Sequence, residues 1–240
     1  MAMANEIQEN IARVRERLEA ACARVGRRPE DVRLVAATKE VAPERIRDAY
    51  QWGLRDFGEN RVQECASKRD ALADLAITWH LIGHLQSNKA KPARDLFTWI
   101  HSVDSLRLAD RLHRAAFGSP DAPDRTDNRL KVLIEVNLGG EATKSGIADT
   151  EALELAGQIG RLDTLQLCGW MLVPPYFDEP EGSRPYFFRL RELAKVVNSA
   201  GLPGVSTQEL SMGMSHDFEV AVEEGATIVR VGTAIFGPRP

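Results

Sequence analysis

Lys39 stands at the end of the apolar run Leu34–Thr38, where its amine would lie among largely uncharged neighbours. Burial in such surroundings disfavours the ammonium ion and lowers its pKa toward the neutral amine, which forms Schiff bases with carbonyl compounds. The alternative is an ordinary surface lysine at the end of a strand. Lys39 is therefore a candidate for carbonyl chemistry.

Two short glycine-containing segments near the end of the chain have the composition of phosphate-binding loops. Such loops hold phosphate through backbone N–H groups, a hydroxyl and a helix N-terminus. Gly213 and Gly232 allow a close backbone approach, Ser211 and Thr233 offer hydroxyl groups, and Ser215 can cap the helix that follows it. The segments are SMGMS, Ser211–Ser215, and VGTAIFG, Val231–Gly237.

Three further polar positions need a structural context before a role can be assigned to them. Arg230 lies within a β-type run, so it must face either a barrel interior or the outer helices. It could bind an anion, donate to an aromatic ring nitrogen, or form a structural ion pair. Asn60 could direct its amide into a site. His80 and His84 are four residues apart, a spacing that shares a face only on a helix, so a metal site is not expected.

The elements that must position these residues alternate along the chain. An amphipathic helix is predicted at Asn5–Val25, ended by Gly26. Eight β-type runs then alternate with helical patterns, which indicates a parallel sheet with right-handed crossovers. The predicted strands are Val32–Ala37, Asp56–Gly58, Thr78–Ile82, Thr98–Val103, Lys131–Asn137, Gln166–Val173, Thr207–Ser211 and Thr227–Val231.

Eight parallel strands are the number that closes a barrel, so the predicted fold class is α/β, a single-domain (β/α)8 TIM barrel over residues 1–240. Residues 1–28 form an additional N-terminal helix that packs on the barrel. In such a barrel the residues that follow the strands converge on one mouth, where function is found. Lys39, Asn60, Ser211 and Gly232 would then meet. An open, doubly wound sheet is the alternative.

Composition limits the classes of partner. A net charge of −4 and a pI near 5.8 argue against a nucleic-acid or membrane surface, because either would require a basic face. The three cysteines form neither a disulfide framework nor a metal spacing. With no long apolar run and no secretory signal, we expect a cytoplasmic protein.

The ordered set of motifs resembles the pyridoxal phosphate homeostasis protein family, over nearly the whole chain. Leu81 stands where that family more often has Phe or Met, a conservative difference. The matching segments are Thr38–Lys39 (TK), Gly58–Glu64 (GENRVQE), Trp79–Lys89 (WHLIGHLQSNK), Glu135–Asn137 (EVN), Lys144–Gly146 (KSG), Leu210–Asp217 (LSMGMSHD) and Val229–Gly237 (VRVGTAIFG).

The resemblance implies a barrel like the N-terminal domain of alanine racemase, with the aldehyde of pyridoxal 5'-phosphate (PLP) joined to Lys39. It assigns Arg230 to the pyridine nitrogen and Asn60 to a place beside the cofactor, with His84 and Met171 as further neighbours. The residues that it assigns to the phosphate are Ser211, Met212, Gly232 and Thr233.

Three functions are compatible with this site. The first is a PLP-binding protein of intracellular PLP homeostasis that holds and delivers the cofactor through a Lys39 Schiff base, with PLP-dependent apo-enzymes as possible recipients. The second is a PLP-dependent amino-acid racemase. The third is a cofactor-free lyase or aldolase that forms a Schiff base with a phosphorylated substrate. We expect a monomer or weak homodimer.

Little or no turnover of amino acids is expected. Racemisation needs an acid or base group on each face of the substrate, and in alanine racemases a tyrosine from a second domain of the partner subunit serves the face opposite the lysine. The chain ends at Pro240, shortly after the eighth strand, so we expect that domain to be absent. Of the tyrosines, Tyr176 is the one near the mouth, while Tyr50 and Tyr186 lie in predicted helices.

Overall fold

The computed structural model describes residues 2–117, 129–140 and 145–238. Eight parallel strands close into a barrel, in sequence order, with β8 hydrogen-bonded back to β1. This closure excludes the open, doubly wound sheet. The strands are β1 (Arg33–Ala37), β2 (Asp56–Glu59), β3 (Thr78–Leu81), β4 (Trp99–Val103), β5 (Leu130–Glu135), β6 (Leu165–Met171), β7 (Glu209–Met214) and β8 (Ile228–Val231).

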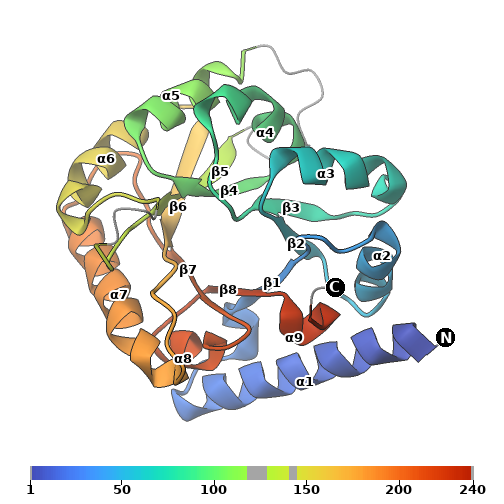
Figure 1. The fold of residues 1–240 in the computed structure, drawn as a ribbon. Coiled ribbons are helices and arrows are strands. Elements are labelled where there is room, and N and C mark those ends of the chain that lie inside the picture. Colours follow the sequence, from blue (N-terminus) through green and yellow to red (C-terminus); the bar gives the residue numbers. More distant parts are fainter. Residues whose placement is uncertain (1, 118–128, 141–144, 239–240) are drawn as a thin grey trace.

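Helices surround the strands (Figure 1). Helix α2 begins at Pro43, whose fixed φ suits a first helical turn. Ser105 caps α5 by accepting a hydrogen bond from the Leu108 N–H at 3.3 Å. The helices are α1 (Ala2–Arg24), α2 (Pro43–Gln51), α3 (Val62–Arg69), α4 (Ala90–Leu96), α5 (Leu106–Arg114), α6 (Ala152–Ile159), α7 (Arg184–Ser199), α8 (Phe218–Glu223) and α9 (Thr233–Phe236).

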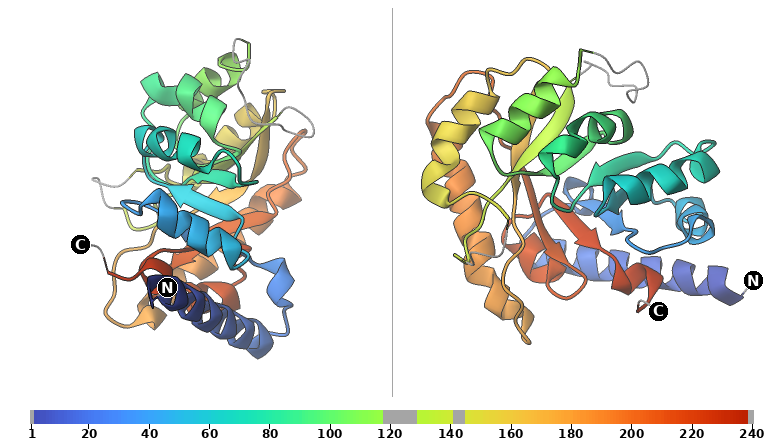
Figure 2. Two further views of the ribbon diagram at one scale, coloured as in Figure 1. Left: turned by 90° about the vertical axis from the view of Figure 1, so that its right-hand side faces the viewer. Right: turned by 45° about the horizontal axis from the view of Figure 1, so that its top comes forward.

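Helix α1 lies along the outside of the barrel, beside α8 and α9 (Figure 2). Its apolar side chains Ile7, Ile11 and Val14 are buried there. The Asn10 side chain donates to the Ile235 carbonyl at 2.9 Å and so joins α1 to α9. The predictions of a (β/α)8 barrel and of an additional N-terminal helix that packs on it are therefore confirmed.

The apolar core has two layers. A large outer cluster fills the space between the strands and the helices. A small inner cluster lies inside the barrel, and polar side chains of other strands share that interior. The inner cluster contains Val35, Trp99, Leu133, Cys168, Met171 and Ile228.

The seventh strand differs from its prediction as Thr207–Ser211. Thr207 is held outside the sheet, because its N–H and hydroxyl both bond to the Asn198 side chain. The strand instead continues to Met214, with an irregular register after Ser211 and a φ of 89° at Gly213 that favours glycine. The prediction made Ser211 the last residue of this strand, whereas Ser211 lies three residues before its end at Met214.

No helix in the described part of the chain is both long enough and apolar enough to cross a lipid bilayer. Cys22, Cys65 and Cys168 are free and buried, so each serves as a small apolar side chain. Lys144 of the KSG motif lies outside the described residues.

Candidate functional site

Lys39 directly follows Thr38 at the carboxyl end of β1, on the rim of the barrel. Its side chain is 29% exposed, and its amine lies 3.8 Å from a Glu40 carboxylate oxygen. The adjacent strand is β8, in which Val231 pairs with Ala36. A Cβ atom at Gly232 would lie 3.3 Å from the Ala37 carbonyl oxygen, so the loop after β8 passes close to the end of β1. Closure of the barrel thus brings Lys39 and Gly232 to the same part of the mouth.

A buried network outside the barrel wall holds the backbone just before Lys39. The Lys68 amine on α3 donates to the Thr38 carbonyl and to a Glu59 carboxylate oxygen, each at 2.8 Å. The Thr38 hydroxyl donates to the same Glu59 oxygen at 2.6 Å. Burial raises the pKa of Glu59, and the hydrogen bonds from Lys68 and Thr38 oppose that rise. These bonds fix the peptide group from which the Lys39 side chain extends.

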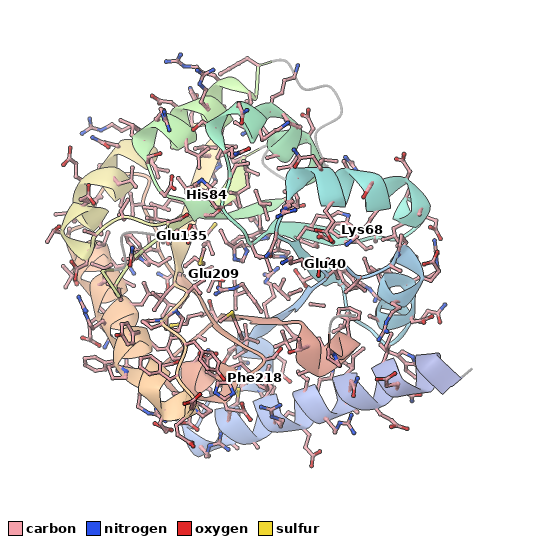
Figure 3. The ribbon with its side chains drawn as sticks, viewed as in Figure 1. Glu40, Lys68, His84, Glu135, Glu209 and Phe218 are labelled. Atoms are coloured by element: carbon pink, nitrogen blue, oxygen red, sulfur yellow. The ribbon has the colours of Figure 1, made fainter. Side chains whose placement is uncertain are left out.

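The same network continues on the other side of Lys39. Lys68 also donates to the Glu64 carboxylate at 2.9 Å, and Glu64 accepts the Glu40 backbone N–H. Glu40 has a φ of 62°, a left-handed conformation that is uncommon for a residue with a side chain. Figure 3 shows Glu40 and Lys68 on the same side of the barrel. Lys39 is therefore flanked by two anchored peptide groups, a feature that the sequence did not indicate.

The loop after β8 carries a group of convergent polar atoms. The Ser215 hydroxyl oxygen accepts the backbone N–H groups of Gly232 at 3.1 Å and Ala234 at 3.3 Å. The prediction that Ser215 caps the following helix was wrong, since the residue at the N-cap of α8 is Asp217. Thr233, the first residue of α9, is exposed beside them. Two N–H groups and two hydroxyls therefore gather at this point of the mouth.

Arg230 faces the barrel interior and is almost completely buried. One terminal nitrogen donates to the Ser211 carbonyl and hydroxyl at 2.7 and 2.6 Å, and the other donates to the Leu172 carbonyl at 2.9 Å. Burial lowers the pKa of Arg230 to about 10, so the guanidinium remains protonated at neutral pH. The Ser211 hydroxyl is thus bonded to Arg230 inside the barrel, whereas the Ser215 hydroxyl lies at the N–H groups of the β8 loop. Met212 points outward into the outer apolar cluster.

Asn60, His84 and Glu135 line one pocket of about 260 Å³ between the ends of β2, β3 and β5. The His84 Nδ1 atom lies 3.0 Å from the Ser145 hydroxyl and 3.4 Å from Asp104. Lys39 does not line this pocket, and a larger hollow of about 380 Å³ lies at the opposite end of the barrel. Among the residues that the structure describes, no group of three or more metal-ligating side chains occurs.

Glu135, which ends β5, is the titratable group that the sequence reading missed (Figure 3). One of its carboxylate oxygens is buried without a hydrogen-bond partner among the described residues. Burial and the neighbouring Asp104 raise the pKa of Glu135 to about 7, although Arg230 opposes the rise. The only sequence signal was its place in the EVN motif. The pocket therefore contains a carboxyl group that is partly uncharged at neutral pH.

Comparison with known proteins gives consistent results. The family profile described as alanine racemase, N-terminal domain, matches residues 4–240. The pyridoxal phosphate homeostasis proteins of Aquifex aeolicus and Pseudomonas aeruginosa are 47% and 44% identical to this chain, over 96% and 97% of it, and 97% and 96% of their own lengths are covered. The structure of PipY of Synechococcus elongatus with PLP bound is similar, with a TM-score of 0.81 and 38% identity over 96% of this chain and 100% of PipY.

Glu135→Gln should remove a pH dependence of stability. Its pKa is about 7 in the folded protein against an ordinary value of 4.5, so the folded state binds more protons than the unfolded state between these values. Wild-type stability should therefore fall as pH rises through this window, and the fall should be on the order of 1–3 kcal/mol. The variant should lack it and so become the more stable protein at pH 8. Urea unfolding at pH 5, 6 and 8 measures this.

The matched control is Glu154→Gln, which changes an exposed glutamate on α6 and should keep the wild-type pH profile. Identical profiles for Glu135→Gln and wild type would show that Glu135 titrates normally.

Proposed function

This chain belongs to the pyridoxal phosphate homeostasis protein family, and on that premise we propose that it binds PLP reversibly at the mouth of the barrel, with Lys39 as the attachment point. Its role is to hold the cofactor and deliver it within the cell, not to use it on amino acids. The observation that carries the proposal is the juxtaposition of Lys39 with the polar loop at Gly232, produced by the pairing of β1 with β8.

The residues at the mouth suit the chemical groups of PLP. PLP supplies an aldehyde, which condenses with a lysine amine with release of one water molecule, and this reaction is reversible. Lys39 is the amine with a partly exposed side chain and an anchored backbone. The Ser215 hydroxyl accepts the N–H groups of Gly232 and Ala234 and keeps its own hydrogen to donate, so it and the exposed Thr233 hydroxyl provide donors for a phosphate. We therefore assign Ser215 to the phosphate and Ser211 to the support of Arg230.

Arg230 is proposed to face the pyridine nitrogen. A guanidinium donates hydrogen bonds readily but does not give up its proton at neutral pH, even with a pKa of about 10. The ring nitrogen would therefore stay largely unprotonated, and the ring would be a weak acceptor of electron density. Asn60, His84 and Met171 complete the proposed surroundings, with Asn60 and His84 on the pocket wall and Met171 inside the barrel. This combination favours storage of the cofactor over catalysis.

Lys39→Ala should abolish covalent attachment of PLP and leave the fold intact, because the partly exposed side chain contributes little to the core. The visible absorption band of bound PLP should disappear. Reduction of the wild-type complex with borohydride followed by peptide mass mapping should label Lys39. Lys89→Ala serves as the control and should keep the band. A label on Lys89 or Lys144 would show that the attachment point is elsewhere.

Ser215→Ala should weaken PLP binding by roughly 10- to 100-fold, because a hydrogen bond to a charged group contributes about 1.5–3 kcal/mol. Pyridoxal, which lacks the phosphate, should bind far more weakly than PLP to wild type, and the variant should bind it as wild type does. Titration of both ligands measures the two effects. Ser199→Ala, on the last turn of α7, is the control. Equal affinity of wild type for PLP and pyridoxal would refute the phosphate site.

The protein is expected to racemise free amino acids slowly or not at all. Lys39 can serve one face of a substrate, but Tyr176 is 79% exposed and stacks on His216, while Tyr50 and Tyr186 lie in α2 and α7. Lack of one positioned proton donor lowers a rate by about 10²–10⁴-fold. Incubation of the PLP-loaded protein with L-amino acids, followed by chiral chromatography, tests this. Racemisation at about 1 s⁻¹ or faster that Lys39→Ala abolishes would favour the racemase.

A further inference from the structure

A continuous chain of hydrogen bonds crosses the interior of the barrel and ends at Arg230. The Arg230 guanidinium donates to the Ser211 hydroxyl at 2.6 Å, which lies 2.8 Å from His101 Nδ1. His101 Nε2 lies 2.9 Å from His80 Nδ1, and His80 Nε2 lies 2.9 Å from an Asp56 carboxylate oxygen. The chain thus connects the first residue of β2 with β8 through β3, β4 and β7.

The inner members of this chain have no access to water. His80, His101 and Ser211 are completely buried, and His80 stacks on Trp99 with ring centroids 5.7 Å apart. Buried polar groups are costly when they lack hydrogen-bond partners, so each link must have one donor and one acceptor. Asp56 is different, because it lines the hollow of about 380 Å³ beside α1, at the amino-terminal ends of β1 and β2.

The two ends of the chain determine where every proton lies. A guanidinium can only donate and a carboxylate can only accept. Since the Asp56 carboxylate only accepts, His80 carries its proton on Nε2 and donates to it. A neutral His80 then accepts at Nδ1 from His101 Nε2–H. His101 Nδ1 in turn accepts from the Ser211 hydroxyl, whose oxygen accepts from Arg230. All protons point the same way, and both imidazoles are neutral.

The charges around the chain favour this arrangement. Burial lowers the pKa of His80 and, more strongly, of His101, and the cations Arg33, Lys131 and Arg230 add to the effect. Burial tends to raise the pKa of Asp56, but the His80 hydrogen bond and the Arg33 guanidinium, 3.1 Å away, outweigh it. Asp56 is therefore the ionised end, opposite Arg230.

We propose that Asp56, His80, His101 and Ser211 are positioning residues that hold the Arg230 guanidinium in one orientation, with its remaining N–H groups available to the cofactor ring. For its ligand, this inference rests on the proposed function. The hydrogen-bond chain from Asp56 to Arg230 is a property of the protein alone. Three of the five N–H groups of Arg230 are used by Ser211 and Leu172. Because neutral groups separate Asp56 from Arg230, the carboxylate orients the guanidinium without occupying its two remaining N–H groups.

The predicted protonation of His80 and His101 can be tested in the protein without PLP, by NMR of ¹⁵N-labelled histidine side chains between pH 5 and 8. His→Gln variants assign the five histidines. His80 and His101 should both be protonated on Nε2 and remain neutral throughout. Asp56→Asn keeps an acceptor oxygen and should preserve this pattern, whereas Asp56→Ala should alter the His80 signal. A proton on Nδ1 of either residue, or titration of either in this range, would overturn the proposal.

Its consequence for the ligand is tested with Ser211→Ala. Loss of the oriented guanidinium should weaken PLP and pyridoxal by the same factor, about five- to tenfold for one buried hydrogen bond, and should shift the visible absorption maximum of bound PLP. A Ser215 variant should instead affect PLP alone. His113→Gln, outside the barrel, is the control and should change neither quantity. An unchanged maximum and unchanged affinities in Ser211→Ala would refute the positioning role.

Failure of the proposed function and failure of this inference give different results. If wild type binds no PLP, the ligand measurements vanish, but the histidine signals of the unloaded protein still report the chain. If PLP binds to Lys39 and the histidine signals contradict the predicted protonation, the proposed function is retained and the positioning role of the hydrogen-bond chain is refuted.

Discussion

Hydrogen bonding between the first and last strands closes the barrel, and the arrangement of the mouth depends on the register of that pairing. Val35 of β1 lies opposite Arg230 of β8, and Ala36 lies opposite Val231. This register turns Arg230 inward and brings Gly232 beside the residues that precede Lys39. Since successive side chains of a strand alternate between faces, a slip of one residue would turn Arg230 toward the helices. Lys39 and the polar loop would then no longer share the mouth with the inward guanidinium that the proposed ligand site requires.

An inward Arg230 imposes a second constraint, because the interior of such a barrel is normally packed with branched aliphatic side chains. Here the inner apolar cluster shares the interior with polar side chains, among them the buried His80, His101, Ser211 and Arg230. A buried guanidinium must be hydrogen-bonded, and so must each group that bonds to it. The hydrogen-bond chain from Arg230 to Asp56 satisfies this requirement, with every bond donated in the direction of Asp56. The interior side chains thus fill the barrel and also hold Arg230 by hydrogen bonds.

Outside the wall, the network of Lys68, Glu59 and Glu64 does for Lys39 what the inner chain does for Arg230. A buried ion pair is weak evidence for stability, since the desolvation of two charges opposes their attraction. Its geometry is more informative: it fixes the Thr38 carbonyl and the Glu40 N–H on either side of Lys39. The backbone on either side of the proposed attachment lysine is therefore anchored by hydrogen bonds.

Local pattern was enough to predict the fold and the position of Lys39. Apolar runs of strand length, helical periodicity between them and their number indicated the closed barrel, and seven of the strands were located closely. Lys39 could be assigned to the rim because the end of a strand is visible in the sequence itself. The order of the motifs was likewise sufficient for the resemblance to the family.

Only the tertiary structure decided which polar groups meet. Ser211 and Ser215 are indistinguishable as hydroxyls in one motif, but an irregular register and Gly213 direct the first to Arg230 and the second to the β8 loop. The link between His80 and His101 runs across two strands, so no local pattern in the sequence indicated it. Glu135 acquires its raised pKa from burial and from Asp104, which directly follows β4. Such contacts depend on register and closure, which join residues far apart in the chain and leave no local pattern.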